Sequence, residues 1–301
     1  MCMNVKEKYI DPFTDFGFKW LFGTEENKAL LISFLNDLLD IDYPIVDIEY
    51  RNLEKLGLNI ADRKAVFDIF CTDEKKNNFI VELQRAKQKY FKDRSVYYTS
   101  FPIQEQSKKG DLDYELKKVY FVGILEFEMF DNNHNDNYLT KVQLCNTDTK
   151  DIFYDKLTYY YIEMPKFKKS ESELKNHLEE WLYVLNNMSD LTHIPKIFKD
   201  DKLINQAFDL GEFLALPKEK QFAYQHDLKI RLDYKNTIDY AREMAEEDGL
   251  KKGLKQGIEQ GIEQGIEQEK IEIAKNLIKA NVSIDTIILS TGLSHNEIKK
   301  L

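Results

Sequence analysis

Two acidic residues lie on neighbouring segments whose pattern predicts an antiparallel hairpin. The first segment, residues 64–72, carries Asp68, and the second, residues 78–84, carries Glu82. A hairpin that turns about Lys75 places the two acids directly opposite each other, with Cβ atoms roughly 5 Å apart. Carboxylates at that separation repel each other unless a cation lies between them. A hard divalent ion such as Mg²⁺, which takes oxygen ligands, would convert this repulsion into a metal site.

Strand alternation also assigns each side chain of the first segment to a face. Phe67, Ile69 and Cys71 are expected on one face. Lys64 and Asp68 are expected on the other. Acidic residues on the solvated face of a hairpin show the same pattern, so the spacing leaves a surface role and a metal site both open.

A short basic segment follows the second strand. Residues 85–94 contain five basic side chains against one acid, interleaved with Tyr90 and Phe91. Cations next to paired carboxylates are what a phosphodiester substrate requires, although a solvated helix face has the same composition. The formal net charge of −10 over 301 residues argues against a protein that coats nucleic acid non-specifically, because such binding depends on neutralising phosphates.

Several short motifs occur in the order found in one nuclease family. They are Asp15-Phe-Gly-Phe-Lys19-Trp-Leu-Phe-Gly23, Glu26-Asn-Lys28, Leu35-Asn-Asp-Leu-Leu39, Lys64-x-x-x-Asp68, Glu82-x-Gln84 and Arg94-x-x-x-Tyr98. With the glycine-punctuated tail, this series resembles the recombination-promoting nuclease (Rpn) and putative transposase family of the PD-(D/E)XK nuclease superfamily. The resemblance covers nearly the whole chain and is firmest from Asp11 to about Phe127. From residue 170 to residue 240 it rests on order and length.

The resemblance implies an α/β fold, a restriction-endonuclease-like mixed sheet flanked by helices, with a helical C-terminal extension. We expect a nuclease-like domain over residues 8–240, with its core at about 11–165 and a helical part at 170–240. A glycine-repeat helical arm or linker would follow at 241–268, and a small helical module at 269–301.

The same resemblance implies a metal-dependent DNA endonuclease. Asp68 and Glu82 would bind Mg²⁺ or Mn²⁺ together with the backbone carbonyl of Leu83. Gln84 stands where the superfamily usually has Lys; its amide can orient a water molecule but carries no charge. Lys64, on the face of Asp68, is the nearest candidate for the missing catalytic cation.

The resemblance also indicates the residues that would contact DNA. Arg94 is expected to stabilise phosphate charge, because guanidinium binds phosphate through parallel hydrogen bonds. The other expected DNA-binding residues are Lys87, Lys92, Tyr98 and Lys19. No base-reading element is evident, so we expect little sequence specificity. Such a nuclease would act in recombination, transposition or defence against foreign DNA. A catalytically inactive DNA-binding or oligomerising protein is the alternative, because it would keep the same fold.

Hydrophobic periodicity predicts the elements around these motifs. The predicted helices cover residues 15–22, 25–39 after Thr24 as N-cap, 90–108, about 174–185, 203–214 and 217–247. The predicted strands, besides the hairpin, cover residues 45–53, 119–130, 138–146 and 156–164. This order of helix, strand, hairpin, helix and strand is the one expected for a restriction-endonuclease-like core.

The C-terminal part contains a four-residue repeat. Its glycines, each followed by Leu or Ile, are Gly253, Gly257, Gly261 and Gly265. On a helix this pattern gives a smooth groove beside an apolar ridge, which is typical of a self-association arm, and a flexible linker is equally compatible. Ser283 and Ser294 are predicted N-caps of short helices that follow. We expect a homo-oligomer formed through this region.

Composition sets the remaining limits. The chain has no stretch of 18 apolar residues and no signal-peptide core near its N-terminus, so we expect no membrane span. Cys2, Cys71 and Cys145 fit neither a disulfide framework nor a zinc site and indicate a cytoplasmic protein. The five histidines are scattered without ligand spacing, and we expect structural or surface roles for them.

Overall fold

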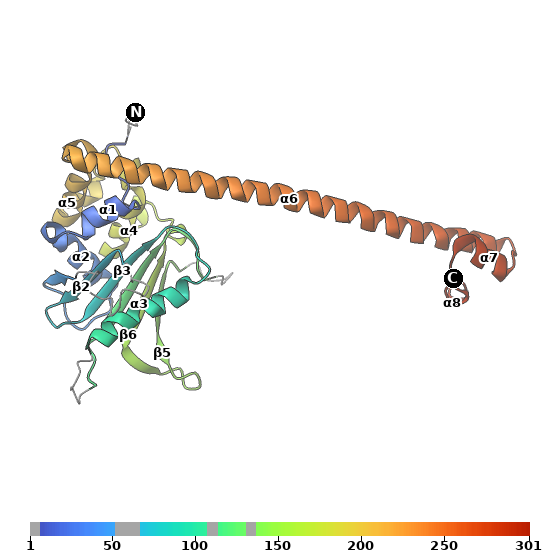
Figure 1. The fold of residues 1–301 in the computed structure, drawn as a ribbon, viewed down its shortest axis with the longest axis horizontal. Coiled ribbons are helices and arrows are strands. Elements are labelled where there is room, and N and C mark those ends of the chain that lie inside the picture. Colours follow the sequence, from blue (N-terminus) through green and yellow to red (C-terminus); the bar gives the residue numbers. More distant parts are fainter. Residues whose placement is uncertain (1–6, 52–66, 107–113, 131–136) are drawn as a thin grey trace, which may run out of the picture. The chain divides into compact units, whose positions relative to one another are not determined.

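The computed structural model describes residues 7–51, 67–106, 114–130 and 137–301. The chain divides into two compact units, Met1–Arg231 and Leu232–Leu301. The first unit contains a six-stranded mixed sheet with helices on both of its faces (Figure 1). The predicted α/β fold, a mixed sheet flanked by helices with a helical C-terminal extension, is confirmed.

Six strands form one sheet in the order β1-β2-β3-β4-β6-β5. They are β1 (Ile48–Tyr50), β2 (Ile69–Asp73), β3 (Asn78–Gln84), β4 (Val119–Leu125), β5 (Leu139–Cys145) and β6 (Ile152–Glu163). β1, β2 and β3 pair antiparallel, β3, β4 and β6 pair parallel, and β5 lies antiparallel beside β6. Every residue of β3 and β4 is buried, because helices cover these central strands on both faces.

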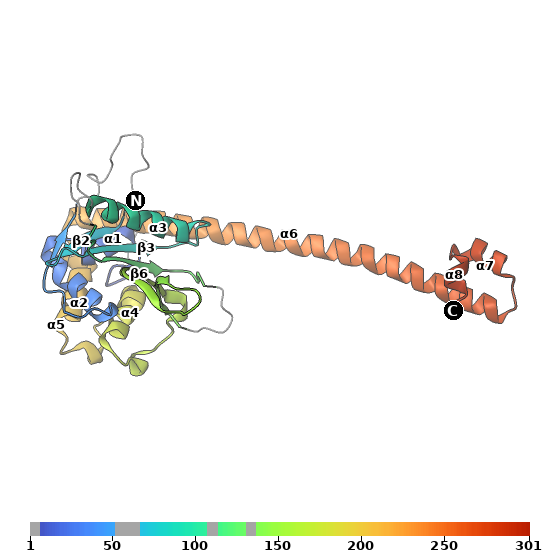
Figure 2. The same cartoon turned by 90° about the horizontal axis from the view of Figure 1, so that it is seen from below.

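The two faces of the sheet carry different numbers of helices. One face packs against α1 (Asp15–Phe22), α2 (Lys28–Leu38), α4 (His177–Asn187) and α5 (Lys202–Gly211). The other face is covered by α3 (Phe91–Gln106), which Figure 2 shows across the sheet from the first group. Alternate side chains of β3 therefore enter different cores, with Val81 in the first and Ile80 beneath α3.

Polar contacts hold α3 on the sheet. Ser95 and Thr99 lie one helical turn apart and are buried. Their hydroxyl oxygens lie 2.7 and 2.8 Å from the hydroxyl oxygens of Tyr161 and Tyr159, which point to the same face of β6. These paired contacts set the rotation of α3 about its own axis and therefore decide which of its side chains face the sheet.

The predicted hairpin is confirmed. Its second strand occupies the expected residues, Asn78–Gln84, and Ile69 of the first strand pairs with Val81. Continuing this register by one residue places Asp68 opposite Glu82, as the turn about Lys75 predicted. The hairpin register therefore follows from the length of the polar turn and from the strand pattern.

The predicted face of Phe67 is wrong. Because β2 begins at Ile69, strand alternation does not extend back to residue 67. The ring of Phe67 lies 4.7 Å from that of Tyr98 and packs in the core beneath α3, whereas Ile69 and Cys71 pack in the opposite core. The remainder of the predicted strand, residues 64–66, lies outside the described residues.

Other predicted boundaries shift. The segment predicted as one helix over 25–39 consists of a 3-10 turn at Glu25–Asn27 followed by α2, and within the described residues the Thr24 hydroxyl caps neither. β1 is shorter than predicted and β4 ends at Leu125. β6 begins earlier than predicted, at Ile152, and α3 continues through Pro102.

One long helix, α6, runs from Lys218 to Lys279. It begins one residue after the start of the predicted helix 217–247, covers the rest of it, and includes the whole glycine repeat, which is therefore helical. The apolar residues of the repeat are between 50 and 64% exposed and are Leu254, Ile258, Ile262 and Ile266. The apolar ridge predicted for this segment is thus presented to solvent in the second unit.

A small core stabilises the end of the second unit. It consists of Ala274, Ile287, Leu293 and Ile298. Two short helices, α7 (Ile284–Thr291) and α8 (His295–Ile298), begin after the predicted N-caps Ser283 and Ser294. In the part of the chain that the structure describes, no helix is both long enough and apolar enough to cross a membrane.

Candidate active site

The two predicted acids meet where β2 begins and β3 ends. Asp68 immediately precedes β2, and its Oδ2 accepts a hydrogen bond of 2.8 Å from the backbone N–H of Leu83. The backbone N–H of Asp68 donates to Oε2 of Glu82 at 3.4 Å. The side chains of Asp68 and Glu82 are 20% and 8% exposed. The structure therefore brings Asp68, Glu82 and Leu83 together at one point.

Burial makes negative charge on this pair costly. Loss of solvent raises the pKa of Asp68 above its ordinary value. Burial and then the neighbouring charge of Asp68 raise the pKa of Glu82 to about 8. Without a bound cation, burial and the charge of Asp68 therefore favour the protonated form of Glu82. A cation between the two carboxylates would favour their ionised forms, so the pair has the electrostatics of a cation site.

Arg94 of α3 lies against Glu82 and Gln84. Its Nη2 donates to Glu82 Oε1 at 2.9 Å and also contacts the amide oxygen of Gln84. Its Nη1 donates to Gln88 Oε1 at 2.6 Å. The amide nitrogen of Gln84 donates to the carbonyl oxygen of Ala86 at 3.2 Å, which turns the amide oxygen of Gln84 toward the guanidinium. A positive charge from the following helix thus stands beside Gln84.

The guanidinium of Arg94 is not saturated with hydrogen bonds. Among the described residues, its Nε is buried without an acceptor. An unpaired buried donor ordinarily costs about 1–3 kcal/mol. The Tyr98 ring lies 5.5 Å from Arg94 Cζ, so the two residues share one face of α3. Arg94 therefore keeps one buried donor without an acceptor, at the energetic cost that its place beside Glu82 entails.

Lys19 reaches the acids from the opposite layer of helices. Its Nζ lies 2.7 Å from Asp15 Oδ1 and 3.7 Å from Asp68 Oδ1. The hydroxyl of Thr14 accepts the backbone N–H of Gly17 and caps α1, which carries Lys19. Position 17 requires glycine because a Cβ there would lie 2.3 Å from a backbone carbonyl oxygen. Lys19, which the sequence predicted as a DNA-binding residue, therefore lies beside Asp68, and Asp15 pairs with its ammonium group.

The part of the chain that contains this site matches the sequence model of a known protein family. Residues 12–241 match the family model described as PD-(D/E)XK nuclease family transposase. The chain belongs to this family. The matched region includes the whole sheet, the helices on both of its faces and the first part of α6. No curated protein and no solved structure matches the chain.

The PD-(D/E)XK pattern places Gln84 at the position that usually holds Lys. Lys64, the predicted substitute for that cation, lies outside the described residues. Arg94 already places a guanidinium next to the Gln84 amide. The sequence predicted Arg94 only as a phosphate-binding residue, because its contact with Glu82 depends on how α3 is rotated against the sheet.

A solvent-accessible hollow of about 490 Å³ lies beside Arg94 at the start of α3. It is lined by basic and aromatic side chains that include Lys89, Tyr90, Tyr97 and Tyr98. Tyr90 and Tyr97 are 63 and 45% exposed. Arg94, the neighbour of Glu82, and the predicted residue Tyr98 therefore both line an open hollow whose exposed rings are suited to stacking on bases.

The remaining predicted DNA-binding residues are Lys87 and Lys92, which do not line this hollow. Lys87 is exposed in the segment between β3 and α3. Lys92 lies in the first turn of α3, with its Nζ 4.9 Å from the ring of Phe130. Among the described residues, the ion pairs of Asp68 and Glu82 are with Lys19 and Arg94, and the DNA-binding roles of Lys87 and Lys92 stay predictions.

Arg231 of α6 is joined to the site through Glu126, a connection that the sequence did not predict. Nη1 and Nη2 of Arg231 each donate to Glu126 at 2.6 Å, and its Nε lies 2.9 Å from Asp11 Oδ2. The backbone N–H of Glu126 donates to the carbonyl oxygen of Gln84 at 3.0 Å. No local spacing could show this connection, because Arg231 and Glu126 are 105 residues apart.

Proposed function

We propose that the chain is a divalent-metal-dependent endonuclease that hydrolyses DNA phosphodiester bonds. Family membership supports nuclease-type chemistry. The observation that carries the proposal is the buried Asp68–Glu82 pair beside the guanidinium of Arg94. Asp68, Glu82 and the Leu83 backbone carbonyl would hold Mg²⁺ or Mn²⁺, which take oxygen ligands. Such an ion, when bound, polarises the phosphate and lowers the pKa of the attacking water.

The protein's own side chains would position the scissile phosphate. Arg94 supplies the positive charge that the usual Lys carries, and it stands against Glu82 where a bound phosphate would meet it. Gln84 orients this guanidinium through its amide oxygen. Lys19 lies 3.7 Å from Asp68, where its charge lowers the pKa of that carboxyl against the effect of burial.

DNA is the proposed substrate because the hollow beside Arg94, next to the acids, is lined by Lys89 and exposed aromatic rings. Lys87, Lys92 and Tyr98 would contact the phosphate backbone and sugar. Backbone contacts of this kind position a duplex but carry little sequence information. We therefore propose cleavage with little sequence specificity, in recombination, transposition or defence against foreign DNA.

Metal removal tests this proposal. Supercoiled plasmid should remain intact with chelator-treated protein and be nicked or linearised after Mg²⁺ or Mn²⁺ is restored, as quantified on agarose gels. The Asp68→Ala variant, purified identically, controls for contaminating nucleases. Cleavage that persists in chelator would contradict metal dependence. Retained DNA binding in gel shifts with no cleavage in any ion would favour the alternative, a catalytically inactive DNA-binding protein.

We also propose that the chain forms a homo-oligomer through its C-terminal region. The half-exposed apolar ridge of α6 supports this proposal. Replacing Ile258, Ile262 and Ile266 together with Ser should lower the solution mass measured by light scattering. Ile and Ser have similar helix propensities, so the helix itself should persist. Leu214→Ser, at an exposed position of the first unit, is the control, and an unchanged mass of the triple variant would contradict the proposal.

A further inference from the structure

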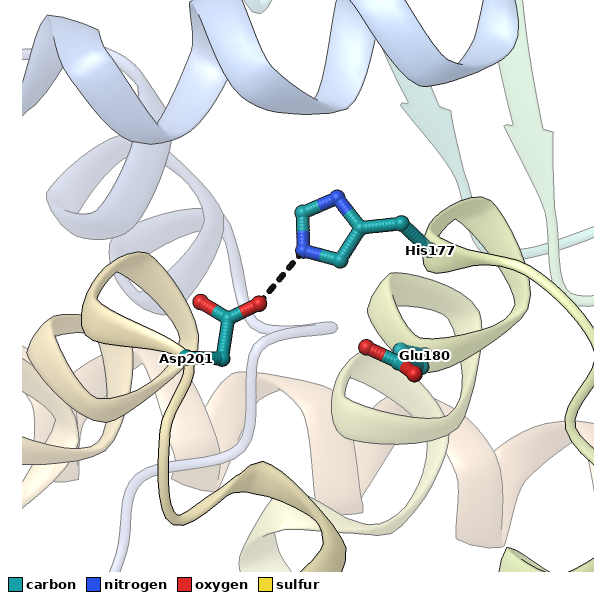
Figure 3. Close-up of side chains that lie close together, drawn as sticks. All are labelled: His177, Glu180 and Asp201. Carbon is teal, nitrogen blue, oxygen red and sulfur yellow. Dashed lines mark hydrogen bonds and ion pairs between the residues drawn. The ribbon is translucent and has the colours of Figure 1, made fainter.

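A second group of titratable side chains lies among the helices on the face of the sheet opposite α3. His177 is the first residue of α4, and Glu180 follows it by one helical turn. Asp201 is the N-cap of α5, and Asp37 lies in the last turn of α2. Figure 3 shows His177, Glu180 and Asp201 converging from α4 and α5. The group shares no element with the acids of the proposed nuclease site.

The donor atoms of this group are close together and reachable from solvent. His177 Nε2 lies 2.7 Å from Asp201 Oδ2, and one ligand atom from each of His177, Glu180 and Asp201 lies within 4.8 Å of the others. The side chains of His177 and Asp201 are 32 and 23% exposed. An ion could therefore enter without unfolding of the surrounding helices.

Outer partners orient two of the three donors. Asp37 Oδ2 lies 2.6 Å from His177 Nδ1, which leaves Nε2 directed at Asp201. Oδ1 of Asp201 accepts the backbone N–H groups of Leu203 and Ile204 at 2.9 and 2.8 Å, which leaves Oδ2 directed at His177. A carboxylate on the far nitrogen of an imidazole is the arrangement that orients metal-binding histidines.

The charges around the imidazole also favour a cation. Three carboxylates, those of Asp37, Asp201 and Glu180, face a single histidine. Within the described residues, the Glu180 carboxylate has no hydrogen-bond or salt-bridge partner, although its burial raises its pKa above the ordinary value. Protonated His177 balances only one of these negative charges, whereas a divalent ion would balance two.

We propose that His177, Glu180 and Asp201 form a binding site for a divalent transition metal such as Zn²⁺, distinct from the proposed nuclease site. The ion would bind His177 Nε2 in place of its proton and take one oxygen from each acid. Metal–ligand bonds of about 2.0–2.2 Å require the Nε2–Oδ2 separation to widen to roughly 3.3 Å. The mixed nitrogen and oxygen donors favour Zn²⁺ over Mg²⁺, which prefers oxygen ligands.

Equilibrium dialysis against Zn²⁺, with excess Mg²⁺ present, tests this site in untagged full-length protein. The Asp68→Asn/Glu82→Gln background removes the acids of the proposed nuclease site, so that the two sites are measured separately. This background is expected to bind one equivalent of Zn²⁺. His177→Gln should weaken binding by about 100-fold or more and Asp37→Asn by about 10–100-fold. His193→Gln, at an exposed histidine, should leave binding unchanged.

Glu180→Gln keeps the test decisive even if His177→Gln fails to fold. Since the Glu180 carboxylate has no hydrogen-bond or salt-bridge partner among the described residues, the amide should preserve the melting temperature of the metal-free protein. Zn²⁺ should raise the melting temperature of the background protein, and this rise should be largely lost in Glu180→Gln. Absence of Zn²⁺ binding in the background, or equal binding in the Glu180→Gln variant, would overturn the proposal and leave His177 as a protonated clamp between helices.

Discussion

Glu82→Gln is expected to abolish plasmid cleavage and also to stabilise the metal-free protein at alkaline pH. An amide of the same shape can still accept the hydrogen bond from Arg94, but it lacks the charge with which a carboxylate binds a divalent ion. Loss of several kcal/mol of metal-derived transition-state stabilisation corresponds to a decrease in cleavage rate of about 10³-fold or more. The measurement is the initial rate of plasmid nicking at saturating Mg²⁺ or Mn²⁺.

The stability effect has the opposite sign because Glu82 is buried. Its folded-state pKa of about 8 lies above the ordinary value of 4.5. The stabilisation from this group is therefore complete below the ordinary pKa and is lost as the pH rises through the folded-state pKa. Gln does not titrate, so the variant should melt roughly 5 °C above the wild type near pH 9 and close to it near pH 5.

Glu74→Gln is the matched control for both measurements. Glu74 is exposed in the turn of the same hairpin, so its replacement should change neither cleavage nor the pH dependence of melting. Saturating Mg²⁺ should close the stability gap between wild type and Glu82→Gln, because the ion favours the ionised carboxylates. Cleavage by Glu82→Gln within about tenfold of wild type would reject Glu82 as a metal ligand. Identical pH profiles of melting would reject the argument from burial.

Arg94→Ala is expected to lower cleavage by about 10²–10³-fold, the usual effect of removing one group that stabilises transition-state charge. If Arg94 takes the part of the missing Lys, then adding Gln84→Lys to Arg94→Ala should restore cleavage by about tenfold or more. Arg94→Lys should retain intermediate activity, because a lysine keeps the charge but not the planar geometry of the guanidinium.

Arg51→Ala controls for the loss of an arginine elsewhere. Arg51 pairs with Glu105 on the surface at 3.3 Å, so its removal should leave cleavage near the wild-type rate. Circular dichroism of each variant separates loss of activity from loss of fold. The proposed role of Arg94 as substitute cation would be rejected by one combination of results. In that case Gln84→Lys alone cleaves plasmid, but Gln84→Lys together with Arg94→Ala is no more active than Arg94→Ala.

The meeting of Asp68 and Glu82 could be predicted from the sequence because it depends on local rules. The two residues are 14 positions apart and are joined by one polar turn, whose length sets the register of the hairpin. The order of motifs then indicated the family, which the match over residues 12–241 shows. The same local rules failed at Phe67, where the strand had not yet begun.

The partners of the two acids could not be predicted in this way. Periodicity assigns a residue to a broad face of a helix, whereas a hydrogen bond requires atoms to lie about 2.7–3.2 Å apart. The contact of Arg94 with Glu82 depends on the rotation of α3, which Ser95 and Thr99 set through β6, at least 60 residues away.

His177 shows the same limit more strongly. The spacing of His177 and Glu180 on one helix was a signal that the sequence contained, but scattered histidines gave no reason to choose this one. Its other partners, Asp37 and Asp201, lie 140 and 24 residues away and are brought to it by the packing of three helices. Turn length and strand alternation act between neighbours in the chain and can be recognised there. Contacts between distant elements depend on how whole helices pack against the sheet, which no short stretch of the chain specifies.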